Sequence, residues 1–455
     1  MDSAIVTLRQ LSLVAGDLLI FCASLAAALW LRNIFGETHL ELRDHVYPFA
    51  IIFILWVAVF YISGFYDLAL GRNRLALLKN AASALLAAAA VAIAFFYLVP
   101  QIGIAPKTTL FLDLGLTAIT LPLWRILYDR FLTGSRLRRR IIFVGLNDEA
   151  RELIGLLKEN PQLGLDVVAA IALDGSDAPG VPVRRTLDGF RDFLRQENVS
   201  TVVLSLSPRT SSELADELYE SIFLKIDFVD VINFYETITR RVPVSAISRI
   251  WFLENLQESR KNLYEILKRG LDIAGAALIG VFTLAITPFV AILIWLSDRG
   301  PIFFSQERVG KDGRRFWVKK FRTMIVDAEK DGARYAEKND SRITTVGKIL
   351  RLTRIDELPQ CLNVLLGEMS FIGPRPERPE FAEEITRDMP YYPMRLLVRP
   401  GLSGWAQINY PYYATPAEQR LKLQYDLFYI KNRSFFLDLL IAMRTLNTIL
   451  RAKGQ

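Results

Sequence analysis

Residues 273–296 read IAGAALIGVFTLAITPFVAILIWL, an uncharged apolar run deep inside the chain. A helix needs about 20 apolar residues to cross the hydrocarbon core of a bilayer, so this run is long enough to span one. Two features argue against a simple span. Pro288 removes a backbone N–H in the middle of the run and favours a kink. Basic residues flank both ends, at Lys268 and Arg269 before the run and between residues 299 and 320 after it.

A re-entrant helix explains these features better than a span does. Because Lys and Arg prefer the cytoplasmic side, a crossing helix would carry the second basic cluster to the wrong side. A helix that enters and leaves by the same face accounts for both the proline and the charges. We therefore predict a re-entrant membrane helix over 273–296, with its kink at Thr287 and Pro288. The alternative is a fifth span, with the last third of the chain outside the cell.

Four further apolar runs fill the first third of a chain that is 52% hydrophobic, at 11–31, 46–62, 81–99 and 108–128. Each approaches the roughly 20 residues of a spanning helix. The first run is not followed by a small-residue cleavage signature, so we expect it to be an anchor. Basic residues are concentrated in the second loop and after the fourth run. This bias predicts a four-helix transmembrane bundle over 1–135 with both ends in the cytoplasm.

The composition also limits the available chemistry. The excess of Lys and Arg behind the net charge of +7 partly reflects membrane topology and attraction to anionic lipid, so nucleic acid binding is not required to explain it. The only histidines are His39 and His45, in a predicted outer loop, and the only cysteines are Cys22 and Cys361. The cytoplasmic part therefore cannot build a His-based triad, a His/Cys zinc site or a disulfide framework.

Between residues 136 and 250, short β-rich runs alternate with helical ones. We expect strands at 141–145, 166–173, 201–206 and 228–232, and helices near 147–159, 187–196 and 211–224. This alternation predicts a parallel doubly wound sheet, which is a Rossmann-like domain. After the first strand, GLNDEA (145–150) keeps only the first Gly of the GxGxxG fingerprint and turns Asp148 and Glu149 towards a pyrophosphate. We expect a structural or regulatory domain rather than a dinucleotide site.

The last third of the chain contains two adjacent carboxylates, Asp356 and Glu357, within TRIDELPQCLN (353–363). On an α-helix they would point about 100° apart, so one can bind Mg²⁺ while the other attacks a substrate. A lone Asp-Glu pair is usually a solvated helix face. Here the missing histidines, the neighbouring membrane helix and a set of basic residues suited to a diphosphate favour a catalytic site. The basic residues are Arg308, Lys320, Arg322, Arg351, Arg354, Arg375 and Arg399.

From about residue 262 onwards the chain resembles the monotopic phosphoglycosyl transferases, the bacterial sugar transferase family. The matching motifs are KRGLD (268–272), KFRTM (320–324), DELPQ (356–360), GEMSFIGPRPE (367–377), RPGLSGWAQ (399–407) and YDLFYIKN (425–432). Four membrane helices and a Rossmann-like domain before a catalytic domain (251–455) resemble the large members. Thr287 stands where the family has Ser, and Tyr410, Pro411, Tyr412 and Tyr413 follow WAQIN where it often has Gly-Arg.

The resemblance implies a function and a place in the cell. It implies transfer of a sugar 1-phosphate from a UDP-sugar to undecaprenyl phosphate with release of UMP, as the first step of exopolysaccharide or O-antigen synthesis. The enzyme would be multi-pass in the bacterial inner membrane, its catalytic domain would face the cytoplasm, and a homodimer is plausible. A hexose is the expected sugar, and glucose or galactose is a guess from the large-member architecture.

The resemblance also assigns residues. Asp356 would be the nucleophile that forms a covalent phosphosugar intermediate, and Glu357 would bind Mg²⁺. Arg322, Arg351 and Arg375 would contact phosphates, with Lys320 and Arg354 beside them. Two other hypotheses remain open. A nucleotide-sugar dehydratase or epimerase would need a glycine-rich turn and Tyr-x-x-x-Lys, which residues 140–250 lack. A non-enzymatic membrane scaffold for polysaccharide assembly would leave the two carboxylates without a role.

Overall fold

The computed structural model describes residues 2–35, 42–66, 74–99, 107–132, 138–178, 180–206, 212–256, 261–326, 328, 340–410 and 415–450. The chain divides into two compact units, residues 1–239 and 240–455. Most of the loops whose charges predict the membrane orientation lie outside the described residues, as do Pro411, Tyr412 and Tyr413. The division into three domains and the orientation therefore stay predictions.

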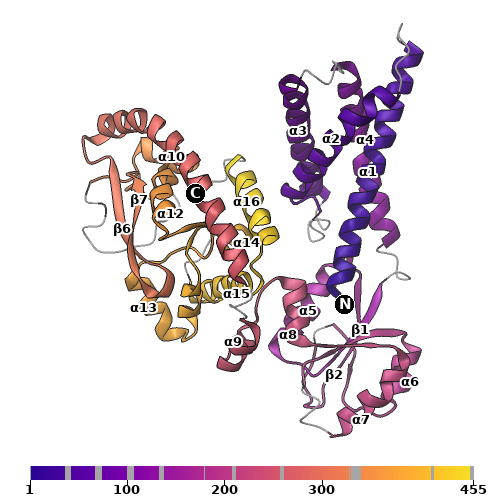
Figure 1. The fold of residues 1–455 in the computed structure, drawn as a ribbon. Coiled ribbons are helices and arrows are strands. Elements are labelled where there is room, and N and C mark those ends of the chain that lie inside the picture. The colour runs from indigo at the N-terminus through magenta and orange to yellow at the C-terminus, as the bar shows by residue number, and fades with distance from the viewer. Residues whose placement is uncertain are drawn as a thin grey trace. The chain divides into compact units, whose positions relative to one another are not determined.

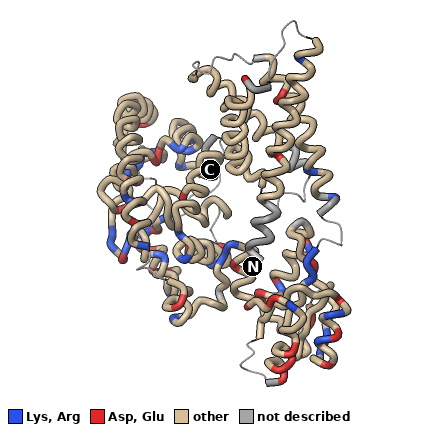
Figure 2. The backbone as a smooth tube through the Cα atoms, turned by 45° about the vertical axis from the view of Figure 1, so that its right-hand side comes forward, with Lys and Arg blue, Asp and Glu red and all other residues tan. Residues whose placement is uncertain are grey.

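The first unit begins with four long apolar helices (Figure 1): α1 (Asp2–Phe35), α2 (Leu42–Ile62), α3 (Arg74–Leu98) and α4 (Lys107–Leu132). They share one hydrophobic core, in which Phe21, Trp56 and Leu121 are fully buried. Figure 2 shows few charged residues along these helices. With α10 they make five described helices that are long and apolar enough to cross a membrane, so the prediction of a membrane protein is confirmed.

Polar side chains of α1 and α4 face each other in what we call the α1–α4 seam. At one position Arg125 Nη2 donates to Asp17 Oδ2 over 2.6 Å, and both side chains are buried. Two further contacts are Ser12 with Tyr128 (2.6 Å between hydroxyl oxygens) and Arg32 Nη1 donating to Thr109 Oγ1 (2.7 Å). Polar groups turned inward are what a hydrocarbon environment requires.

The Rossmann-like sheet follows, with strands β1 (Arg139–Val144), β2 (Leu165–Ile171), β3 (Val183–Arg184), β4 (Val199–Leu204) and β5 (Asp227–Asp230). All pairs are parallel and the spatial order is β3-β2-β1-β4-β5, which confirms the predicted sheet. Two separate hydrophobic clusters lie on its two faces. The helices are α5 (Asp148–Glu159), α6 (Phe190–Gln196), α7 (Ser212–Ser221) and α8 (Val231–Thr239), with short 3₁₀ helices at Pro161–Leu163 and Ile222–Leu224.

Two elements of this domain differ from the sequence prediction. The strand expected at 228–232 ends at Asp230, and the unpredicted helix α8 begins at once. The cause is the Asp230 side chain, whose Oδ1 accepts hydrogen bonds from the amides of Ile232 (2.9 Å) and Asn233 (3.3 Å) and so starts a helix. Strand β3 was also missed, because two residues carry no readable periodicity.

In the second unit, α9 (Arg249–Asn255) precedes α10 (Asn262–Asp298), which is longer than the predicted 273–296 and largely exposed along its apolar side chains. Figure 1 shows that α10 bends partway along its length. Pro288 explains the bend, because it cannot donate to the Leu284 carbonyl. Thr287 Oγ1 donates to the Thr283 carbonyl (2.7 Å), one residue away from the acceptor that the proline frees. Re-entry itself stays a prediction.

The rest of this unit packs short elements against α10. The antiparallel hairpin of β6 (Phe303–Val309) and β7 (Arg315–Phe321), with a 3₁₀ turn at Lys311–Gly313, shares a core with Ala276 of α10. Then come α11 (Thr345–Leu352), the 3₁₀ helix η10 (Ile355–Gln360) and α12 (Cys361–Leu366). The remaining elements are β8 (Ser370–Ile372), α13 (Pro379–Asp388), η11 (Tyr392–Leu397), β9 (Gly401–Ser403), α14 (Trp405–Asn409), α15 (Pro416–Asn432) and α16 (Phe435–Leu450).

Candidate active site

The two carboxylates lie on a 3₁₀ helix, not on the α-helix assumed from the sequence. Pro359 explains the difference, because it has no N–H to donate to the Ile355 carbonyl. The segment closes instead by shorter bonds such as Glu357 N to Arg354 O (3.3 Å). With about three residues per turn, adjacent side chains diverge by roughly 120°, so Asp356 and Glu357 still face different partners.

Glu357 is held by cationic side chains from three segments. Its Oε1 lies 3.2 Å from Lys320 Nζ on β7, 3.3 Å from Arg375 Nη2 and 4.0 Å from Arg354 Nη1. Burial alone would raise the pKa of Glu357, but these cations outweigh it and hold the pKa well below its usual range. Burial in turn lowers the pKa of Lys320, and the charge of Glu357 opposes that shift.

Asp356 is the more isolated of the two carboxylates. Only 7% of its surface is exposed, and Oδ1 is buried without a hydrogen-bond partner in the described part of the chain. Burial and then the charge of Glu357 raise its pKa to about 6, against the opposing effect of Lys320, Arg351 and Arg354. An unpartnered carboxylate oxygen keeps its lone pairs available, which a nucleophile needs.

The predicted phosphate-contact residues fall into two groups. Lys320, Arg354 and Arg375 meet at Glu357, and the field of Arg351 reaches Asp356 while its Nε donates to Thr323 Oγ1 (2.9 Å). Arg322 is placed elsewhere. It is 7% exposed and pairs with Asp298, at the end of α10. A role of Arg322 at the phosphates stays a prediction that this contact does not support.

The charges of the site suit a phosphate ester. Four cationic side chains surround two carboxylates, which leaves positive charge for a diphosphate. No group of three or more His, Cys, Asp or Glu side chains that could hold a metal ion occurs among the described residues. Mg²⁺ typically needs only one or two protein carboxylates, with water and substrate phosphates completing its shell. A single ionised carboxylate such as Glu357 therefore fits Mg²⁺ that binds together with a substrate.

Sequence reasoning missed a buried charge network behind Arg375. Arg395 pairs with Asp426 (2.8 Å), and Lys422 pairs with Glu377. Burial would raise the pKa of Glu377, but Lys422, Arg395 and Arg308 outweigh it and lower the pKa to about 2. A signal for part of this network exists in the sequence, because Lys422 and Asp426 are four residues apart among the buried apolar residues of α15.

Other uncertain positions are now placed. Trp405 is 5% exposed, donates from Nε1 to the Arg240 carbonyl (3.1 Å) and stacks on Phe428, so it packs inside the unit. The Tyr410 hydroxyl donates to Glu418 (3.2 Å). Helix α16 buries Ile441 but exposes several large apolar side chains, among them Phe436.

The first β-to-α turn of the Rossmann-like domain is filled and acidic, in contrast to the basic surroundings of Asp356 and Glu357. Gly145 adopts a left-handed conformation (φ +87°), and a Cβ there would lie 2.6 Å from Leu206 Cγ. Asn147 Oδ1 accepts the amide of Ala150 (2.9 Å) and so occupies an N–H at the start of α5. With Asp148 and Glu149 in the first turn, the helix start is already capped and acidic.

Fold and site together define a membrane protein with a buried pair of carboxylates among cationic side chains. The profile of the family described as bacterial sugar transferase matches residues 263–452. A UDP-glucose:undecaprenyl-phosphate glucose-1-phosphate transferase of Xanthomonas campestris pv. campestris is 31% identical over 328 residues, covering 69% of this chain and 67% of that protein. The chain therefore belongs to the bacterial sugar transferase family.

Two relatives show higher identity over shorter stretches. A UDP-N-acetylgalactosamine-undecaprenyl-phosphate N-acetylgalactosaminephosphotransferase of Aeromonas hydrophila is 44% identical over 219 residues, or 48% of this chain and 51% of that protein. A putative undecaprenyl-phosphate N-acetylgalactosaminyl 1-phosphate transferase of Bacillus subtilis (strain 168) is 50% identical over 134 residues, 29% of this chain and 74% of that protein. The chain thus spans about half the length of the Aeromonas relative.

A second profile, described as a CoA-binding domain, matches residues 61–233. The described residues of the first β-to-α turn do not fit the diphosphate of CoA. Leu206 fills the space beside Gly145, and two carboxylates stand in the first turn of α5. A diphosphate needs free N–H groups and a positive helix end at such a turn. We derive no role for CoA.

Proposed function

We propose that this chain transfers a sugar 1-phosphate from a UDP-sugar to undecaprenyl phosphate and releases UMP. The observation that carries the proposal is the buried pair Asp356 and Glu357, enclosed by Lys320, Arg351, Arg354 and Arg375. The names of the relatives state a sugar-phosphate transfer to undecaprenyl phosphate for those proteins, which supports the same reaction here.

The first half-reaction forms a bond between Asp356 and the donor. A carboxylate oxygen of Asp356 attacks the phosphorus that carries the sugar, the bond from this phosphorus to the oxygen of the uridylyl phosphate breaks, and UMP leaves with that oxygen. Arg375 and Lys320 lie on the Glu357 side, where they can bind the phosphate oxygens and neutralise the charge that moves to UMP. In phosphoryl transfer, positioning and charge neutralisation supply most of the rate enhancement.

The second half-reaction restores the enzyme. A phosphate oxygen of undecaprenyl phosphate attacks the same phosphorus, the bond to Asp356 breaks, and the product is a lipid diphosphate that carries the sugar. Splitting the transfer in this way separates the encounter with a water-soluble donor from the encounter with a lipid acceptor. The exposed apolar helix α10 of the same unit supports placement of the site at a membrane surface.

Mg²⁺ is part of the proposal as the cofactor that Glu357 would hold. When bound, it would neutralise phosphate charge and lower the repulsion between donor and carboxylate. Lys320, Arg354 and Arg375 keep Glu357 ionised, which a metal ligand requires.

The wider setting belongs to the same proposal. We place the enzyme in the bacterial inner membrane with the catalytic domain in the cytoplasm, at the first step of exopolysaccharide or O-antigen synthesis. The names of relatives specify glucose, N-acetylgalactosamine and galactose, so UDP-glucose, UDP-N-acetylgalactosamine and UDP-galactose are the first donors to test.

The test is to trap the intermediate and locate it. Purified protein would be incubated with Mg²⁺ and each UDP-sugar without lipid acceptor, digested and mapped by mass spectrometry. The proposal expects a phosphosugar on Asp356, its loss on adding undecaprenyl phosphate, and no label in Asp356→Asn or without Mg²⁺. Label on another residue contradicts the assignment of the nucleophile. UMP release by Asp356→Asn at the wild-type rate also contradicts that assignment. If the wild-type protein releases no UMP from any UDP-sugar, the scaffold and dehydratase hypotheses stand instead.

A further inference from the structure

The loop Pro374–Glu377 presents Arg375 to Glu357 but cannot fold on its own backbone bonds. Two of its four residues are prolines, which have no N–H to close a turn. Its four successive carbonyl groups are instead bonded by other segments. They accept from Gly401 N (2.9 Å), Arg395 Nη2 (2.7 Å), Arg308 Nη1 (3.1 Å) and Val309 N (2.9 Å), in chain order from Pro374 to Glu377.

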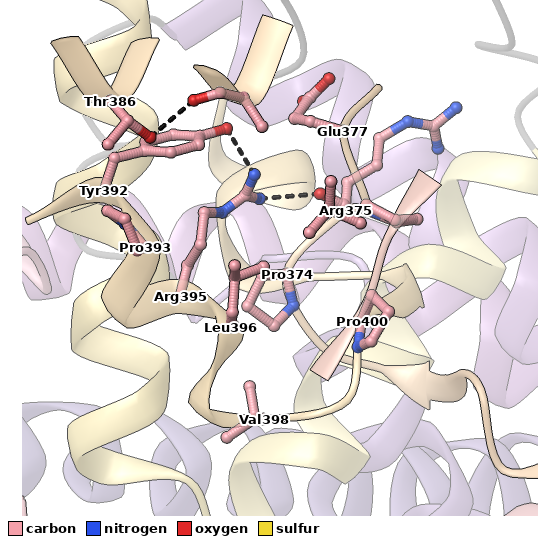
Figure 3. Close-up of a pocket in the computed structure, with 13 residues that line it drawn as sticks. Pro374, Arg375, Glu377, Thr386, Tyr392, Pro393, Arg395, Leu396, Val398 and Pro400 are labelled. Carbon is pink, nitrogen blue, oxygen red and sulfur yellow. Dashed lines mark hydrogen bonds between the residues drawn. The ribbon is translucent and has the colours of Figure 1, made fainter. Parts of the chain in front are cut away.

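Arg395 makes the contact at Arg375 itself. Its guanidinium donates to the Arg375 carbonyl, to Asp426 Oδ2 (2.8 Å) and to the Tyr392 hydroxyl (2.6 Å). Figure 3 shows this guanidinium between the Tyr392 ring and the backbone at Arg375, while the Arg375 side chain points away from it. The Arg395 side chain is 3% exposed and that of Asp426 is 1% exposed. A buried charge of this kind persists only where it is paired and hydrogen-bonded.

The surrounding charges anchor this guanidinium firmly. Asp426 projects from α15 one turn after Lys422, and Lys422 pairs with Glu377 at the end of the same loop. Arg308 Nη1, 3.8 Å from Glu377, bonds the Pro376 carbonyl from β6. The loop is thus held between the hairpin and α15 by both its main chain and its terminal carboxylate.

The neighbouring cavity excludes direct contact between Arg395 and a sugar nucleotide there. Lined by Tyr392, Arg395, Pro374 and Pro400 among others, it has a volume of about 30 Å³ (Figure 3). This is room for one or two water molecules and far less than the roughly 300 Å³ of a small-molecule site. Arg395 therefore acts on the reaction only through the residues that it holds.

We propose that Arg395 is a positioning residue: by fixing the Arg375 carbonyl, it keeps the Arg375 guanidinium at Glu357 and in place for the donor diphosphate. The inference rests on the proposed function for its substrate, but the geometry of the loop can be measured separately. The hydrogen bond at 2.7 Å to the Arg375 main chain carries it.

The experiment is a double-mutant cycle. Arg395→Lys keeps the charge opposite Asp426 but loses the planar fork that reaches three acceptors at once. We expect it to lower kcat for UMP release about tenfold, and Arg375→Ala about 100-fold, since a small misplacement can cost about that much. Because Arg395 acts through Arg375, the double variant should match Arg375→Ala within about twofold. If the double variant instead loses about 1000-fold in kcat, which is the product of the two single losses, the proposal is overturned.

A matched control separates positioning from general destabilisation. Arg433 is also buried, pairs with Glu265 (2.9 Å) and donates to a carbonyl, that of Ile430 (2.9 Å), away from the loop. The fold-losses of kcat caused by Arg433→Lys and by Arg375→Ala should multiply in the double variant. If the Arg433 cycle shows the same loss of additivity, the coupling is not specific to the loop and the proposal fails.

Hydrogen exchange supplies a readout that needs no activity. Peptides containing Val309 or Gly401, whose amides donate to the Glu377 and Pro374 carbonyls of the loop, should exchange faster in Arg395→Lys than in the wild type. The same peptides should be unchanged in Arg433→Lys. If wild-type protein releases no UMP from any UDP-sugar, the proposed function fails, and faster exchange still upholds the role of Arg395 in the loop. Unchanged exchange in Arg395→Lys rejects it, whatever the activity.

Discussion

The first β-to-α turn of the Rossmann-like domain and the turn before η10 each place a left-handed residue shortly before a helix, and they use it in opposite ways. At the first β-to-α turn of the Rossmann-like domain the residue is Gly145 (φ +87°), and before η10 it is Arg354 (φ +58°). Glycine adopts this conformation without strain, whereas a residue with a long side chain is strained by about 1 kcal/mol or more.

The difference separates a structural turn from a functional one. Leu206 fills the space beside Gly145, and carboxylates follow it in the first turn of α5. Arg354 adopts a strained backbone conformation, and its Nη1 lies 4.0 Å from Glu357 Oε1. A strained residue that places a charge on a buried carboxylate indicates a functional site. A left-handed glycine beside a Leu side chain and an acidic helix start does not. Four predictions test this contrast.

The largest effect is expected from matched Asp→Asn substitutions at the two turns. Asp356→Asn removes the proposed nucleophile and should lower UMP release at least about 1000-fold. Asp148→Asn, in the exposed first turn of α5, should change it less than about twofold. UMP release from a UDP-sugar by purified protein measures both. Equal effects of the two substitutions would remove the basis for separating the turns.

Arginine substitutions give the next largest effect. Arg375→Ala removes a cation from Glu357 and from the donor phosphates, and should lower kcat about 100-fold, as loss of one transition-state donor typically does. Arg151→Ala removes an exposed pair with Asp148 (3.3 Å) and should leave kcat unchanged. A wild-type kcat in Arg375→Ala contradicts the proposed site.

Arg354→Gly should separate activity from stability. Glycine relieves the left-handed strain at φ +58° but deletes the charge facing Glu357. We expect about tenfold lower kcat, since one exposed charge contributes about 1 kcal/mol, with an unchanged or slightly raised unfolding temperature. Thermal unfolding and steady-state kinetics on one preparation check this. Lower stability together with full activity would show that Arg354 is structural.

Gly145→Ala should change stability but should have the smallest effect on catalysis. The added Cβ would lie 2.6 Å from Leu206 Cγ at a φ that alanine avoids, so the unfolding free energy should fall by about 1–3 kcal/mol. UMP release per folded molecule should stay within about twofold of wild type, with Gly155→Ala on the exposed side of α5 as the control. A large catalytic loss would link this turn to the reaction.

The sequence predicted those parts of the fold that carry strong patterns. Apolar runs located the five long helices, and alternating runs located most of the parallel sheet, because burial of apolar surface dominates there. The start of α8 was missed because one Asp230 side chain decides it. The 3₁₀ geometry of the carboxylate pair depends on Pro359, a local effect that hydrophobic periodicity does not report.

The site was predicted residue by residue with uneven success. Asp356, Glu357, Lys320, Arg354 and Arg375 come together, because three family motifs and the residue just before η10 meet at Glu357. Arg395 and Asp426 were not predicted, because they are 31 residues apart and only the tertiary fold pairs them. Arg322 was predicted at the site because it belongs to the KFRTM motif, but it pairs with Asp298 instead.

The α1–α4 seam has a consequence for how the protein is made. Asp17 and Arg125 are 108 residues apart, so α1 leaves the ribosome long before its counter-ion exists. A carboxylate without a counter-ion inside the hydrocarbon core disfavours partition of its helix into lipid by about 3 kcal/mol. We therefore expect nascent chains cut before residue 125 to integrate less stably than chains that include it.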